Sequence, residues 1–143
     1  HGDVYEANYQ QYAKEFDVLD EEYRTTLSAL PQKSFIVAHE AFGYLCYDYG
    51  LEQVALEGLM SESEPDPARM AEVVRFAQEK GITTVFFEEM VDPKVAQTIA
   101  REIGADTATL NPLEGLTQED MDNGREYFSV MRENLQALKE ALE

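Results

Sequence analysis

One histidine and several carboxylates follow predicted strands, and these residue types could do chemistry. His39 follows the apolar run 35–38, Glu88 follows 82–87, and Glu114 lies in a loop beyond 107–110. An imidazole can bind a metal ion or move a proton near neutral pH, and carboxylate oxygens can complete either site. The alternatives are an inert, hydrogen-bonded His39 and a solvated Glu114.

The sequence favours structural roles for two further side chains, a carboxylate and a thiol. Strand alternation sends Glu88 or the adjacent Glu89 inward, and a buried carboxylate needs a partner such as a helix N-terminus. Cys46, seven residues after His39, is interpreted as a small buried hydrophobe, because no histidine adjoins it. The sequence also lacks a GxSxG motif.

The elements that must position these side chains alternate along the chain. Apolar runs at 35–38, 54–56, 82–87 and 107–110 predict strands, with helical patterns between them. A single last helix is predicted after a capping-box-like Thr117-x-x-Asp120. This order predicts an α/β fold: a four-stranded parallel sheet with helices on both faces. Ligands of such sheets bind beyond the carboxyl ends of the strands.

A long helix precedes the sheet. Its apolar side chains follow steps of three and four: Tyr5, Tyr9, Tyr12, Phe16, Leu19, Tyr23 and Leu30. A helix of about 25 residues measures near 40 Å, which is too long for a small domain to cover. It could form a coiled-coil seam or run on to a second domain. We therefore divide the chain into a helix at 1–30 and an α/β lobe at 31–143.

Composition excludes several functions. The 143 residues carry a formal charge of −18, which argues against binding nucleic acid or anionic membranes. No glycine-rich phosphate loop is present, so nucleotide binding is not expected. We also find no signal peptide and no run of about 18–20 apolar residues.

Four stretches in order carry a family resemblance. The segment FIVAHEAFGY at 35–44 resembles a motif of zinc-type substrate-binding proteins of bacterial ABC transporters. The stretches at 85–96, 100–105 and 110–116 are similar to further motifs of that family. The resemblance covers essentially the whole chain.

The resemblance implies a two-lobed receptor with its metal between the lobes. This chain would be the C-terminal lobe with the connecting helix, and His39 and Glu114 would be its two metal ligands. A missing N-terminal lobe would supply two histidines. Other residues would line the pocket or support the ligands: Glu40, Phe42, Tyr44 and Glu88.

The implied function is zinc binding and delivery to a membrane ABC permease, with no catalysis and no catalytic cofactor. Zinc is favoured over manganese because manganese-type relatives usually carry a carboxylate where His39 stands. The protein would be extracytoplasmic, in the periplasm or lipid-anchored at the outer face of the membrane. Its signal and anchor would lie outside this chain.

Three alternatives stay open: a manganese-binding relative, a surface adhesin of the same fold, and an enzyme with His39 as general base and Glu88 or Glu114 as its partner. With two ligands unfilled, the isolated lobe should bind zinc weakly. The apolar stripe of the first helix could also promote dimers.

Overall fold

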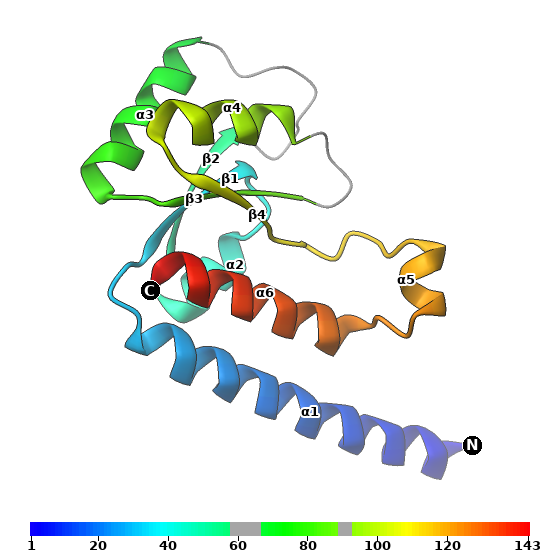
Figure 1. Cartoon of the computed structure of the whole chain (residues 1–143). Helices are drawn as coiled ribbons and strands as arrows, with labels where there is room; N and C mark the ends of the chain where they lie inside the picture. The colour runs from blue at the N-terminus through cyan, green and yellow to red at the C-terminus, as the bar shows by residue number, and fades with distance from the viewer. Residues whose placement is uncertain (58–66, 89–92) are drawn as a thin grey trace.

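The computed structural model describes residues 1–57, 67–88 and 93–143. Helices and strands alternate as predicted (Figure 1). The elements are α1 (Gly2–Ala29), β1 (Ser34–His39), α2 (Gly43–Tyr49), β2 (Glu52–Glu57), α3 (Pro67–Lys80), β3 (Thr84–Phe87), α4 (Lys94–Ile103), β4 (Asp106–Thr109), α5 (Gln118–Asp122) and α6 (Tyr127–Leu142). Within the described residues, no helix is both long and apolar enough to cross a membrane.

The four strands form one parallel sheet in the order β2-β1-β3-β4. Ile36 pairs with Val85 between the two central strands, and Phe87 pairs with Thr109 between β3 and β4. Since all strands point the same way, their carboxyl ends lie at one edge of the sheet. The predicted fold class is confirmed.

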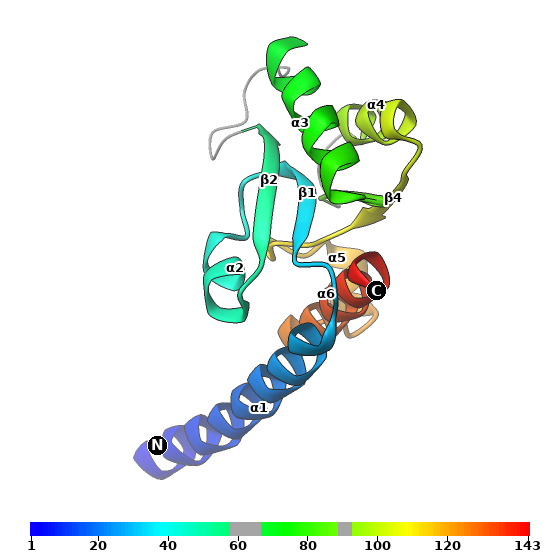
Figure 2. The same ribbon diagram turned by 90° about the vertical axis from the view of Figure 1, so that its left-hand side faces the viewer.

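Helices cover both faces of the sheet, as predicted (Figures 1 and 2). Phe35 and Val37 point into a core shared with α1, α2 and α6, whereas Ile36 between them points into a second core with α3 and α4. This alternation follows from the two-residue period of a strand. The sheet is therefore buried between two apolar layers and forms a rigid support.

The long first helix is present, and only its C-terminal half contains buried residues. Its buried residues are Leu19, Tyr23 and Leu27. The Tyr23 hydroxyl donates to the Met131 carbonyl of α6 at 2.5 Å. Tyr5 and Tyr9 lie on the same stripe but are 71% and 65% exposed, where the N-terminal end projects past α6 (Figure 1).

The prediction of a single last helix is wrong, because two helices, α5 and α6, follow Thr117. The Thr117–Asp120 capping box is present, but it starts the short α5. Gly124 then adopts a left-handed φ of 75°, and a second capping box between Glu126 and Ser129 starts α6. A left-handed glycine interrupts a helix, and the new cap satisfies the amides of the next one.

Candidate metal centre

His39 is the last residue of β1, at the carboxyl edge of the sheet. Its strand lies between β2 and β3, so its backbone is paired within the sheet interior. The chain then turns sharply, because the Ala41 amide donates to the His39 carbonyl at 2.9 Å. The side chain is only 16% exposed. Because β1 is held rigidly in the sheet, the His39 ring can move little.

Glu88 is the partner of His39. It follows β3 directly, its side chain is 9% exposed, and its Oε1 lies 2.7 Å from His39 Nδ1. A carboxylate accepts hydrogen bonds, so the neutral ring would carry its hydrogen on Nδ1 and its lone pair on Nε2. Glu88 is thus the inward-facing carboxylate that the sequence pattern anticipated, and its partner is the histidine. Glu89 lies outside the described residues.

Glu114 is exposed and lies in the loop between β4 and α5. Buried hydrogen bonds hold the start of this loop: the Asn111 amide donates to Asn134 Oδ1 at 2.8 Å, and Asn134 Nδ2 donates to the Asn111 carbonyl at 2.7 Å. The Leu113 amide donates to Asn111 Oδ1 at 2.8 Å, and Leu113 has a left-handed φ of 61°. The loop is therefore anchored at its base, with Glu114 at the residue after Leu113.

The two predicted ligands share an edge of the sheet, and the donor set is incomplete. Residues 1–57, 67–88 and 93–143 contain no group of three or more His, Cys, Asp or Glu side chains that could hold a metal ion. A closed zinc site uses about four ligands. The described lobe brings His39 and Glu88 together, and Glu114 is an exposed carboxylate that does not form a three-residue group with them.

The three other predicted site residues have different environments. Glu40 is exposed and lines two surface cavities. Phe42 is 5% exposed and packs in the main core, so it lines neither of these cavities. Tyr44 is 90% exposed and borders the second cavity on α2.

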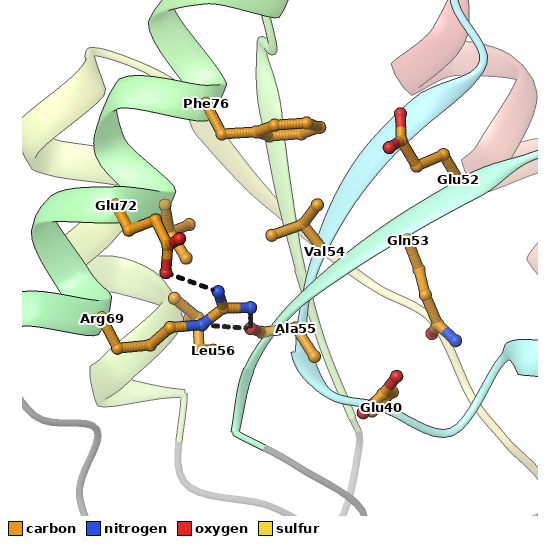
Figure 3. Close-up of a pocket in the computed structure, with 10 residues that line it drawn as sticks. Glu40, Glu52, Gln53, Val54, Ala55, Leu56, Arg69, Glu72 and Phe76 are labelled. Carbon is orange, nitrogen blue, oxygen red and sulfur yellow. Dashed lines mark hydrogen bonds and ion pairs between the residues drawn. The ribbon is translucent and has the colours of Figure 1, made fainter.

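A cavity of about 530 Å³ lies between β2 and α3 (Figure 3). Arg69 crosses it: Nε and Nη2 donate to the Ala55 carbonyl at 3.2 and 2.6 Å, and Nη1 contacts Glu72 Oε2 at 2.8 Å. The guanidinium is thus engaged by its own lobe. Glu40 is the one predicted site residue that borders this cavity, so the cavity is separate from the His39–Glu88 pair.

Cys46 has the environment of a core residue, as expected. It is 7% exposed within the main core, and burial raises the pKa of its thiol to about 11. The thiolate is the nucleophilic form of cysteine. At neutral pH this side chain is therefore protonated and acts as a small apolar group.

Sequence reasoning missed Asn111 and Asn134 as parts of this region. Asn134 occupies the apolar stripe of α6 beside Met131, Leu135 and Leu138, and it is 3% exposed. A polar residue inside an apolar helical stripe is a signal, because burial requires hydrogen-bond partners. Its partner could not be predicted, since it lies 23 residues upstream.

These observations define a parallel α/β lobe with a hydrogen-bonded His39–Glu88 pair at the carboxyl ends of its strands. Residues 1–141 match the family described as ZnuA, zinc-uptake complex component A, periplasmic. The chain belongs to this family. The predicted family is thereby confirmed, and its description is that of an uptake component.

Two curated relatives support the assignment. The high-affinity zinc uptake system protein ZnuA of Bacillus subtilis is 44% identical over 140 residues, covering 98% of this chain and 44% of that protein. The zinc-binding lipoprotein AdcA of Streptococcus pneumoniae is 44% identical over 138 residues, covering 96% of this chain and 28% of that protein. The chain spans less than half the length of either relative.

Solved structures agree with the fold. The Zn(II)-bound ZnuA-like domain of Streptococcus pneumoniae AdcA is 42% identical with a TM-score of 0.80, covering 98% of this chain and 52% of that chain. The laminin-binding protein Lbp of Streptococcus pyogenes is 35% identical with a TM-score of 0.88, and the match covers 99% of this chain and 54% of that chain. The lobe architecture is therefore that of zinc-binding and laminin-binding relatives.

Proposed function

We propose that this chain is the C-terminal, zinc-binding lobe of an extracytoplasmic solute-binding protein that delivers zinc to an ABC permease. His39 and Glu114 supply the ligands of this lobe. The observation that carries the proposal is the 2.7 Å contact between Glu88 Oε1 and Nδ1 of the mostly buried His39 ring. Histidines that bind metals usually donate their second ring nitrogen to such a carboxylate.

The chemistry of the ligands favours zinc over manganese. Neutral imidazole suits zinc, whereas manganese prefers carboxylate and other oxygen ligands. Glu88 orients the His39 ring, and Glu114 contributes the oxygen ligand. Zinc is the cargo here, and we infer that the lobe performs no catalysis: its one cysteine is buried and protonated at neutral pH.

The other half of the site would come from an N-terminal lobe. Two ligands from this lobe leave two positions of a four-ligand zinc site to be filled. The relatives are more than twice as long as the shared region, which leaves room for another lobe. In this arrangement residues 1–30 connect the lobes and 31–143 form the C-terminal lobe. The exposed tyrosines near the start of α1 fit a helix that continues toward further protein.

The proposal is tested by zinc titration of the full-length protein. Competition with a chromogenic chelator would give the dissociation constant of the wild type and of the His39→Ala and Glu114→Ala variants. We expect each change to weaken zinc binding by more than roughly 100-fold, because each removes a ligand. Manganese should bind the wild type far more weakly than zinc.

The chain offers matched controls. His1→Ala removes the other histidine, and Glu119→Ala removes an exposed carboxylate in α5, close to Glu114 in sequence. Both variants should keep the wild-type zinc affinity. Wild-type affinity in the His39→Ala variant would overturn the proposal. The isolated chain should bind zinc more weakly than the full-length protein.

A second candidate function is adhesion, favoured by the likeness to laminin-binding protein Lbp. We propose that adhesion uses a surface apart from the metal ligands. Laminin binding by the full-length protein, measured with and without zinc and with His39→Ala, would test this. Binding that is unaffected by zinc and His39→Ala supports it, and no measurable binding rejects it.

A further inference from the structure

Asn134 connects a helix to the loop that carries Glu114. Its side chain lies in the middle of α6 and is 3% exposed, inside a stripe that is otherwise apolar. Oδ1 accepts from the Asn111 amide at 2.8 Å, and Nδ2 donates to the Asn111 carbonyl at 2.7 Å. The carboxamide therefore satisfies both backbone groups of one residue, at the point where β4 has ended.

The connection continues from Asn111 toward Glu114. Asn111 Oδ1 accepts from the Leu113 amide at 2.8 Å, which closes a short Asx-type turn. Leu113 adopts a φ of 61°, a left-handed conformation that a side chain disfavours. Among the described residues it is the only one other than glycine with a positive φ. This conformation persists because the surrounding bonds fix it.

The arrangement explains a buried polar residue that packing alone does not require. Leucine at position 134 would continue the apolar stripe of α6 without needing hydrogen bonds. Asparagine there pairs with both the amide and the carbonyl of Asn111, because buried backbone groups need hydrogen-bond partners. Its two hydrogen bonds fix the backbone at Asn111. Because Glu114 is only three residues further along the chain, the fixed point restricts where Glu114 can lie.

We propose that Asn134 is a positioning residue that sets the place of the Glu114 carboxylate for zinc, acting through Asn111 and Leu113. The inference rests on the proposed function of Glu114 as a zinc ligand. Asn134 itself touches no metal in this scheme. Its contribution is to hold the exposed ligand on a fixed path, so that less freedom is lost when zinc binds.

The test is a double-mutant cycle on the zinc affinity of the full-length protein. Asn134→Leu removes both hydrogen bonds to Asn111 and keeps the branched shape of the side chain, and Glu114→Gln removes the ligand charge. We expect Asn134→Leu alone to weaken zinc binding about tenfold. In the Glu114→Gln background the same change should have an effect below about twofold, because the group it positions is already lost.

Two controls separate positioning from stability. Leu138→Val removes a methylene in the same helix, should lower the melting temperature, and should leave zinc affinity unchanged. If Asn134→Leu does not fold, Asn111→Ala removes the bond to the Leu113 amide and should give the same coupled loss. Cobalt(II) absorption of the loaded variants should shift with Asn134→Leu and not with Leu138→Val.

The outcomes distinguish this inference from the proposed function. Unchanged zinc affinity in both Asn134→Leu and Asn111→Ala overturns the positioning role while leaving Glu114 as a ligand. Equal losses in the wild-type and Glu114→Gln backgrounds also overturn it, because the effect then bypasses Glu114. Unchanged affinity in Glu114→Gln itself overturns the function proposed for Glu114.

Discussion

At the scale of single residues, the contact between His39 and Glu88 is the central feature of the lobe. It joins residues at the ends of two neighbouring strands, β1 and β3. Both strands are fixed by the sheet, so the two side chains meet with little loss of freedom. The imidazole can therefore present a defined ring nitrogen to a metal ion.

We predict that Glu88→Gln weakens zinc binding by the full-length protein about 10- to 100-fold. The amide keeps the size of the side chain but loses the charge that supports Nδ1–H of His39. Chelator competition gives the affinities. Glu119→Gln is the matched control, because it neutralises an exposed carboxylate in α5 that is not among the predicted site residues. Equal effects of the two changes would contradict an orienting role for Glu88.

The residues of the site were predictable to different extents. His39 stands out as the only histidine beyond the first residue, and its place after an apolar run put it at the carboxyl edge. The need of Glu88 for a partner was also predictable. Its pairing with His39 was not, because contact across strands depends on the order and register of the sheet. The Asn134–Asn111 contact likewise depends on how α6 packs against the end of β4.

At the scale of elements, the corner between α5 and α6 depends on charged hydrogen bonds. Asp120 caps α5 together with Thr117. Arg125 bridges Asp120 Oδ1 and Glu133 Oε2, each at 2.6 Å. Hydrogen bonds from Thr117 and then from Arg125 lower the pKa of Asp120 to about 2. The charged carboxylate therefore stabilises this corner.

We predict that Asp120→Asn lowers the melting temperature at neutral pH and that this difference fades in acid. The folded state holds the Asp120 pKa at about 2, below its ordinary value of 3.8, so folding favours the ionised form. Its contribution is complete above about pH 4 and is lost as the pH falls toward 2. Melting curves of both proteins from pH 7 to pH 3 check this. A difference independent of pH would contradict it.

The docking of α1 on α6 gives a second prediction at this scale. Tyr23→Phe removes the hydroxyl that donates to the Met131 carbonyl and leaves the ring in place. We expect the free energy of unfolding in urea to fall by about 1 kcal/mol, the usual value of one buried hydrogen bond. Tyr44→Phe, at a 90% exposed tyrosine, should change it by less than about 0.5 kcal/mol. Equal effects would show that the Tyr23 bond contributes nothing.

The element pattern was largely predictable, since strand runs and helical stripes carry their own periods. All four strands and the long first helix are confirmed, with shifted boundaries. The division into α5 and α6 was not predicted. The sequence contains two capping boxes in succession, and only the second, between Glu126 and Ser129, starts the last helix. Gly124 was the available signal for the break.

At the scale of the whole molecule, strong negative charge and an exposed aromatic stripe have opposite effects on self-association. The chain carries a formal charge of −18, which repels a second copy. Tyr5 and Tyr9 leave apolar surface uncovered on the free part of α1. In the proposed two-lobed protein this part of the helix would lie near the other lobe.

We predict that the isolated chain forms a weak dimer through this stripe and that salt strengthens it. Salt screens the repulsion between exposed charges and leaves apolar contacts intact. Sedimentation equilibrium at low and at about 0.5 M salt should show the dimer fraction rising. Tyr5→Ser with Tyr9→Ser should abolish it, whereas Tyr44→Ser on α2 should not. A monomer at every salt concentration would reject this prediction.

The arginine that spans the cavity beside β2 has a consequence for solubility. β2 is an edge strand, and edges with unpaired backbone groups are templates for strands of other molecules. Arg69 occupies the Ala55 carbonyl with two hydrogen bonds, so one acceptor on this strand is taken. We expect this contact to make β2 a poorer template for the strand of another molecule. In the proposed extracytoplasmic receptor, which would work apart from cytoplasmic chaperones, this protection would prolong the life of the folded lobe.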